Sequence, residues 1–290
     1  FTGAGVAIVT PMNPDLSINW ELLGTLIDDQ IAHGTDAIVI AGTTGEASTM
    51  TDEEHVQSIR FAVERTAGRV PVVAGAGSNH TDYALWLSRE AKQAGADALL
   101  HVTPYYNKTS QAGLVRHFMT LADATDLPVI LYNVPSRTGV NIQPKTYQEL
   151  CKHPNITATK EASGNLSQIA MIRSLCGDEL DIYSGNDDQI VPILSLGGKG
   201  VISVLSNVAP RQTHDICQLY FDGKVRESAD LQIKLLTLIN ALFCDVNPIP
   251  VKEAVCMMGW DAGMCRLPLV ELDPEHKELL SREMRAAGLI

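Results

Sequence analysis

The sequence lacks any apolar stretch long enough to cross a membrane. No apolar run within its 290 residues reaches the roughly 18 residues that a membrane-spanning helix requires. The first residues also lack the charged and then apolar segment that marks a secretory signal. With 45% hydrophobic residues, the composition is that of a globular protein. No membrane partner is therefore expected.

Basic residues are scarce. Lysine and arginine total 22 against 34 aspartate and glutamate residues, which gives a net charge of −12. Because phosphate backbones are bound by basic surface, this balance argues against a nucleic-acid partner. Small anionic substrates are still compatible with it, since they need only a local positive site.

Motifs for metals and dinucleotides are also missing. The eight histidines are scattered, with no HExxH and no Cys/His cluster, so no metal site is predicted. The first strand-to-helix turn carries no GxGxxG, and the sequence suggests no cofactor. No CxxC spacing occurs, and free thiols in a reducing cytoplasm are the simplest interpretation of the six cysteines: Cys151, Cys176, Cys217, Cys244, Cys256 and Cys265.

Short β-rich apolar runs do occur, and they alternate with helical segments. Their nearly continuous apolar character is typical of strands buried on both faces. Eight runs are predicted as strands, at residues 5–9, 37–40, 70–74, 98–102, 128–132, 156–160, 180–184 and 200–204. The helical segments between them are residues 20–33, 52–67, 81–95, 111–125, 166–176 and 187–196.

About eight strand-then-helix units favour a closed (β/α)8 TIM barrel over an open sheet. Thr51 and Glu54 form a capping-box pattern at the start of one of these helices. The barrel is predicted to be a catalytic domain over residues 1–209. Residues 210–290 contain only helical segments, at 210–222, 225–243, 249–258 and 274–287, and are predicted to form a C-terminal helical domain. Whether that extension serves assembly or only covers the barrel stays open.

Lys160 ends one of the predicted strands, and Tyr132 ends the strand before it. Burial disfavours the charged form of a lysine and lowers its pKa, and the neutral amine is a nucleophile. A phenol beside it can move protons while an imine forms. The pair suggests Schiff-base chemistry on a carbonyl substrate. The alternatives are a surface lysine on a loop and a tyrosine that only packs.

Other candidates follow from the rule that barrel active sites lie at the carboxyl ends of the strands. Thr43, Thr44 and Gly45 follow the second strand, where hydroxyls and amides could hold a carboxylate; the alternative is an ordinary glycine-rich turn. Arg137 could bind a carboxylate with its planar fork, or form a surface salt bridge. Gly185 follows the seventh predicted strand, and Ile202 lies within the eighth. For these two residues, backbone geometry and core packing explain the residue type as well as a role in the site does.

Three motifs together resemble the dihydrodipicolinate synthase family: residues 42–46 (GTTGE), residues 132–139 (YNVPSRTG) and residues 160–162 (KEA). The resemblance covers essentially the whole chain. This family belongs to the pyruvate-dependent class I aldolases, which also include N-acetylneuraminate lyase. The resemblance implies a lyase that condenses pyruvate with aspartate 4-semialdehyde, in lysine and diaminopimelate biosynthesis.

The resemblance also implies residue roles. Lys160 would form the imine with pyruvate, and Tyr132 would be the proton donor and acceptor. Thr43 would link it to Tyr106 of a neighbouring subunit, within a homotetramer built as a dimer of dimers. Thr44 and the loop amides, Gly45 included, would hold the pyruvate carboxylate, and Arg137 the semialdehyde carboxylate. Gly185 and the Ile202 carbonyl would line the pocket.

Two other functions are compatible with a barrel of this kind: an aldolase for sugar acids and a non-catalytic binding protein. The residue at position 137 distinguishes the first of them from the synthase. An aldolase for a polyhydroxylated sugar acid would use hydroxyl-binding groups at that position rather than a cation. A non-catalytic keto-acid-binding protein would not need the proton relay.

Feedback inhibition by lysine, which some family members show at the dimer interface, is expected to be weak or absent. His55, Asn79 and Tyr105 match the sensitive pattern, whereas Ala47, Asp52 and Tyr83 depart from it. Tyr83 stands where sensitive enzymes carry a glutamate.

Overall fold

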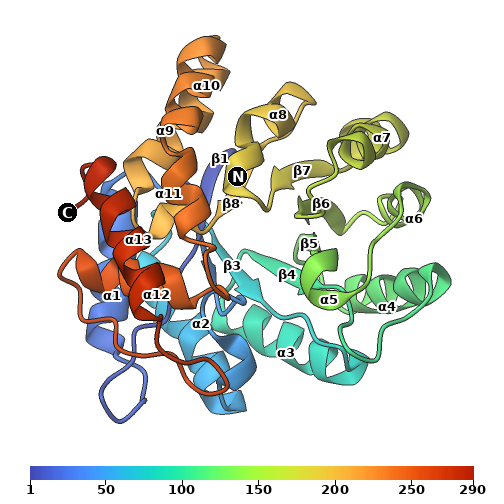
Figure 1. Ribbon diagram of the computed structural model, residues 1–290. Helices are drawn as coiled ribbons and strands as arrows, with labels where there is room; N and C mark the ends of the chain where they lie inside the picture. Colours follow the sequence, from blue (N-terminus) through green and yellow to red (C-terminus); the bar gives the residue numbers. More distant parts are fainter.

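A computed structural model describes all residues, 1–290. Eight parallel strands form a closed barrel in chain order, with β8 paired to β1 (Figure 1). The predicted TIM barrel is therefore confirmed. The strands are β1 Gly3–Ala7, β2 Ala37–Ile40, β3 Val72–Gly75, β4 Ala98–Val102, β5 Val129–Asn133, β6 Ile156–Glu161, β7 Asp181–Ser184 and β8 Gly200–Ser203.

Helices surround the barrel and continue beyond it. Between the strands lie α1 Trp20–Ala32, α2 Asp52–Thr66, α3 Thr81–Ala94, α4 Gln111–Asp123, α5 Pro135–Thr138, α6 Pro144–Leu150, α7 Leu166–Cys176 and α8 Ile190–Ser195. After β8 come α9 Pro210–Phe221, α10 Val225–Lys234, α11 Leu236–Ala241, α12 Ile249–Met257 and α13 Pro274–Ala286. None of these helices combines the length and the apolar character needed to cross a membrane.

Apolar residues separate into a small core inside the barrel and larger cores outside it. Inward-facing side chains such as Val39, Ile130 and Ile202 fill the interior. The alternate residues of the strands face outward and pack against the helices. Because side chains alternate along a strand, Tyr132 and Lys160 point inward while Asn133 and Glu161 point outward.

Local sequence signals account for several helix boundaries. The Thr51 hydroxyl accepts the Glu54 backbone N–H while the Glu54 carboxylate accepts the Thr51 N–H, so the predicted capping box at the start of α2 is confirmed. Short proline-started helices α5 and α6, between β5 and β6, were not predicted.

Several predicted boundaries differ from the structure, and β3, for example, begins at Val72 rather than at residue 70. The first strand runs over residues 3–7 rather than 5–9, because Val9 leaves the sheet and donates its N–H to the Asn207 side chain. The helix predicted over residues 225–243 is divided into α10 and α11.

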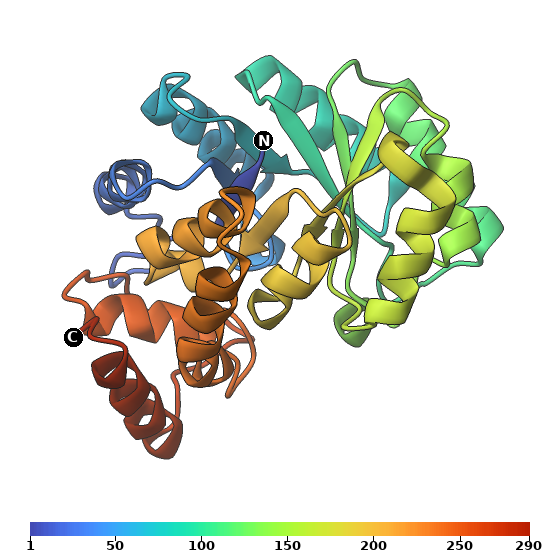
Figure 2. The same ribbon diagram turned by 90° about the horizontal axis from the view of Figure 1, so that it is seen from above.

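The C-terminal helices α11–α13 gather on one side of the molecule, opposite the green helices α6 and α7 (Figures 1 and 2). Helix α9 differs from them because it packs against β1, β8 and α8 and completes the helical layer around the barrel. The division into residues 1–209 and 210–290 stays a prediction.

Candidate active site

The carboxyl ends of the strands open into a cavity of about 900 Å³. Six of the predicted site residues line it: Thr43, Thr44, Tyr132, Arg137, Lys160 and Gly185. They come from five different turns or strand ends, so only the closed barrel brings them together. Gly45, Tyr106 and Ile202 do not line this cavity.

Lys160 and Tyr132 are direct neighbours across the β5–β6 pairing. The Lys160 Nζ lies 4.3 Å from the centroid of the Tyr132 ring. Lys160 is 5% exposed and forms no salt bridge, although it sits at the floor of an open cavity. A buried amine with a phenol beside it is the arrangement that imine formation on a carbonyl compound requires.

Gly185 makes room beside this pair. A Cβ at Gly185 would lie 2.6 Å from the Ala162 Cβ and 3.2 Å from the Lys160 Cγ. Those distances are shorter than ordinary van der Waals contact, so a side chain there would displace β6 or its lysine. The glycine is therefore explained by close approach at the carboxyl end of β6.

The loop after β2 carries the two threonines with different exposure. Thr43 is exposed to the cavity, whereas Thr44 is buried. The Thr44 hydroxyl oxygen accepts a hydrogen bond of 3.0 Å from the Asn247 side-chain amide, which leaves its own O–H free to donate into the cavity. Gly45 is buried behind them, where its carbonyl accepts the Thr10 hydroxyl at 2.8 Å.

Arg137 lies on α5 at the rim of the cavity, with an exposed side chain. Its guanidinium donates one hydrogen bond of 3.3 Å to the Asn247 carbonyl and forms no salt bridge. A guanidinium without a carboxylate partner at a cavity rim can take the carboxylate of a substrate.

Tyr106 and Ile202 lie outside the cavity for opposite reasons. Tyr106, in the loop between β4 and α4, is 92% exposed and has a left-handed backbone with φ of 66°. Ile202 is fully buried inside the barrel below the cavity. Within one chain, Tyr106 is therefore not close enough to be assigned to the site by geometry.

Two buried carboxyl groups flank the lysine, and the sequence had not indicated either. Burial raises the pKa of Glu161, which accepts hydrogen bonds from the Asn133 and Tyr147 side chains on the outer side of β6. Burial also raises the pKa of Asp187, whose carboxylate accepts the backbone N–H groups of Val204 and Leu205.

The segment between α11 and α12 was also missed, although Phe243, Asp245, Val246 and Asn247 line the cavity. The closely spaced prolines at 248 and 250 marked a turn there, but nothing local placed that turn at the barrel mouth. This segment brings the C-terminal extension into contact with the site.

One cluster could in principle hold a metal ion: Asp245, Asp273 and His276, whose ligand atoms lie within 4.8 Å of one another. The Asp273 carboxylate already accepts the His276 backbone N–H at 3.0 Å, as the N-cap of α13. Helix capping therefore accounts for the contact between Asp273 and His276. Asp245 accepts the backbone N–H of Val246.

The cavity extends from the lysine toward α2 and α3, where His55 and Tyr83 line it. The Tyr83 hydroxyl donates a hydrogen bond of 2.7 Å to the Asp52 carboxylate. Burial and this contact together raise the pKa of Tyr83. The phenol therefore stays neutral, and offers no charge to a cationic ligand.

Comparisons with known proteins agree with this geometry. A model of the dihydrodipicolinate synthetase family matches residues 1–287. A protein of Lachnoclostridium phytofermentans named 4-hydroxy-tetrahydrodipicolinate synthase is 58% identical over 291 residues, covering 100% of this chain and 99% of that protein. One of the same name from Caldicellulosiruptor saccharolyticus is 56% identical over 289 residues, covering 100% and 98%. The solved dihydrodipicolinate synthase of Aquifex aeolicus has a TM-score of 0.97 at 42% identity, covering 100% and 99%.

Proposed function

The chain belongs to the dihydrodipicolinate synthetase family, and we propose that Lys160 is the residue on which its reaction takes place. The chain is a lyase of the class I aldolase type, which condenses pyruvate with L-aspartate 4-semialdehyde in lysine and diaminopimelate biosynthesis. The observation that carries the assignment of Lys160 is its buried Nζ, 4.3 Å from the Tyr132 ring at the cavity floor.

The neutral Lys160 amine attacks C2 of pyruvate, and loss of water from the resulting carbinolamine gives an imine. Removal of a proton from the pyruvate methyl group converts the imine to an enamine. The enamine carbon adds to the aldehyde carbon of the semialdehyde, whose oxygen takes up a proton to become the hydroxyl of the product. The amino group of the semialdehyde then displaces Lys160 from C2, which closes the ring and frees the lysine.

Tyr132 is the group that donates and accepts these protons, because its ring already lies beside Nζ. The hydroxyl of Thr43, which lines the same cavity, connects it to Tyr106 of a second subunit. Support for this connection comes from Tyr106 itself, which is 92% exposed in a strained left-handed conformation and does not line the cavity of its own chain. The assembly is a homotetramer built as a dimer of dimers, with each dimer completing two sites.

The two substrates each carry a carboxylate, and a different part of the site binds each one. Thr44, with the loop amides that include Gly45, holds the pyruvate carboxylate close to Lys160. Arg137, whose guanidinium has no carboxylate partner at the rim, holds that of the semialdehyde. Gly185 and the Ile202 carbonyl bound the space around the imine. A sugar-acid aldolase would have no use for a cation at the rim, and the relatives described above carry the synthase name.

The enzyme works in the cytoplasm. All six cysteines are free in the structure, which fits a reducing compartment.

Borohydride reduction in the presence of pyruvate tests the assignment of Lys160. Mass spectrometry of the digested protein should find one pyruvyl adduct, on the peptide that contains Lys160. Lys160→Met should abolish the adduct, whereas Lys152→Met, an exposed lysine after α6, should leave it unchanged. An adduct on another lysine, or none, would refute the proposal. A coupled assay with aspartate semialdehyde then measures the complete reaction.

A further inference from the structure

Glu46, at the end of the loop after β2, is held by the C-terminal extension rather than by the barrel. Its Oε1 accepts a hydrogen bond of 2.7 Å from the Lys252 Nζ of α12. Its Oε2 accepts one of 2.9 Å from the Arg266 backbone N–H. The two charged side chains are only 1% and 2% exposed. Both carboxylate oxygens are thus occupied by groups more than 200 positions away in the sequence.

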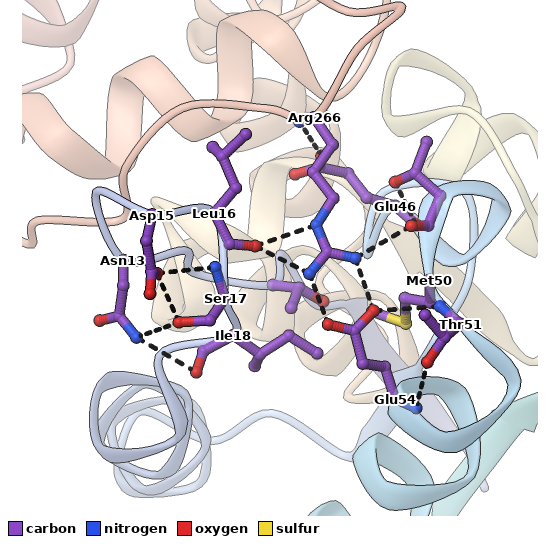
Figure 3. A network of polar contacts seen from close by, with 12 residues as sticks. Asn13, Asp15, Leu16, Ser17, Ile18, Glu46, Met50, Thr51, Glu54 and Arg266 are labelled. Atoms are coloured by element: carbon purple, nitrogen blue, oxygen red, sulfur yellow. Dashed lines mark hydrogen bonds and ion pairs between the residues drawn. The ribbon is translucent and has the colours of Figure 1, made fainter.

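The Arg266 side chain extends this hold to three further segments (Figure 3). Its guanidinium donates to the Leu16 carbonyl at 2.8 and 3.0 Å and to the Thr49 carbonyl at 2.9 Å. It also donates to both carboxylate oxygens of Glu54, at 2.5 and 2.6 Å. The fixed fork of the guanidinium therefore ties the loop after β1, the turn after Glu46 and the start of α2 to the extension.

The loop that these contacts hold has a conformation that is unfavourable on its own. Ala41 and Glu46, at its two ends, both have left-handed backbones, with φ of 53° and 58°. Residues other than glycine rarely adopt this conformation, and they keep it only where surrounding contacts enforce it. The left-handed conformation of Glu46 is held by its two hydrogen-bond partners in the extension, Lys252 and Arg266.

A buried ion pair is a poor way to add stability, because desolvation offsets most of the attraction. Such a pair can instead restrict the segments that carry it to one conformation. Thr44 lies two residues before Glu46 in the same loop. A third contact from the extension, the Asn247 side chain, reaches the Thr44 hydroxyl oxygen at 3.0 Å.

We propose that Glu46, Lys252 and Arg266 are positioning residues through which the C-terminal extension fixes residues 41–46 for pyruvate binding. This inference rests on the proposed function, since it takes Thr44 and the loop amides as the site of the pyruvate carboxylate. The extension then acts on substrate affinity and is more than a cover for the barrel.

Two variants weaken the hold without leaving an unpaired buried charge in the Glu46–Lys252 pair. Arg266→Lys keeps a cation and the backbone N–H that reaches Glu46, but it loses the fork that ties Leu16, Thr49 and Glu54 together. The double variant Glu46→Gln with Lys252→Met makes the buried pair neutral. The matched control is Lys277→Met, which breaks a Lys277–Glu253 pair of 2.6 Å between α13 and α12 inside the extension. Lys277 touches no part of the loop.

The KM for pyruvate should rise about tenfold or more in both loop variants, because binding to a less ordered loop is weaker. Borohydride labelling of Lys160 at saturating pyruvate should stay complete, and amide hydrogen exchange in the peptide over residues 41–47 should become faster. Lys277→Met should match the unchanged protein in KM and in exchange.

The inference is overturned if the loop variants melt at lower temperature but keep the original KM and exchange rate. It is equally overturned if Lys277→Met raises the KM as much as they do, because the effect would then be a general loosening. If the double variant does not fold, the KM and the hydrogen exchange of Arg266→Lys alone test the inference. Absence of any label on Lys160 in the unchanged protein would instead refute the proposed function, while the exchange comparison would still test the hold on the loop.

Discussion

The Tyr147 hydroxyl donates a hydrogen bond of 2.8 Å to the Glu161 carboxylate, on the outer side of the strand that carries Lys160 on its inner side. The Asn133 amide donates to the same carboxylate at 2.9 and 3.2 Å. Asn133 and Glu161 are paired in register directly after Tyr132 and Lys160. The ends of β5 and β6 are therefore joined by side-chain hydrogen bonds outside the barrel, in addition to the backbone hydrogen bonds between the two strands.

Removing the Tyr147 hydroxyl should reduce stability and leave the chemistry largely intact. In Tyr147→Phe the fully buried Glu161 loses a donor, and a buried polar group left without its partner costs about 1–3 kcal/mol. Urea unfolding should show that loss, while kcat falls less than about tenfold. Unchanged stability would show that Glu161 does not depend on this contact.

Tyr132→Phe should have the opposite pattern. The Tyr132 hydroxyl makes no hydrogen bond within the chain, so its removal should change the melting temperature little. Because the hydroxyl is the proposed proton donor and acceptor, kcat should fall by about 10²- to 10⁴-fold. Steady-state kinetics beside a thermal melt makes the comparison, and a kcat close to the original would remove Tyr132 from the mechanism.

Gly185→Ala should impair both folding and activity. The added Cβ would lie 2.6 Å from the Ala162 Cβ, and overpacking of this kind costs about 1–3 kcal/mol of stability. The shift needed to relieve it falls on β6, so kcat should drop as well. Gly24→Ala, on α1, is the control because its Cβ meets only the side-chain ends of Phe61 and Arg65. Equal kinetics for the two variants would contradict the prediction.

The Arg266–Glu54 pair should contribute stability that depends on pH. The hydrogen bonds from Arg266 lower the pKa of Glu54 below its ordinary value of 4.5. A carboxyl with a lowered pKa in the folded state stabilises fully above its unfolded pKa, and loses that contribution as the pH falls through the folded value.

Glu54→Gln keeps the capping box, since glutamine also serves at that position. It should lower the unfolding free energy by about 1–3 kcal/mol at neutral pH, and by progressively less in acid. Urea unfolding between about pH 3 and pH 7 measures this. Glu64→Gln, an exposed glutamate on the same helix, should change stability by less than about 0.5 kcal/mol. A deficit in Glu54→Gln that does not vary with pH would rule out the linkage.

Lysine should inhibit the enzyme weakly or not at all. Tyr83 lines the cavity with a phenol bonded to Asp52, where a ligand ammonium would need a carboxylate. The loss of such a charge partner costs about 2–5 kcal/mol of affinity. Activity measured in millimolar lysine tests this expectation, and strong inhibition would defeat it.

Local patterns in the sequence were sufficient for much of the fold. Alternating apolar runs and helical periods predicted eight strand–helix units, and Thr51 with Glu54 predicted the start of α2. The ends of strands also placed Lys160 and Tyr132 at the cavity, because a parallel barrel brings all its carboxyl ends to one side. The first strand was displaced by two residues, since Val9 leaves the sheet to bond the Asn207 side chain, 198 positions away in the sequence.

The sequence by itself therefore determined which elements form and which reactive side chains end them, because periodicity and capping act over a few residues. It could not determine that Lys252 meets Glu46, or that Asn247 reaches Thr44, since each contact joins positions more than 200 residues apart. Such contacts depend on how the extension packs against the finished barrel. Only the tertiary structure decided that the loop after β2 is contacted by side chains from the C-terminal end of the chain.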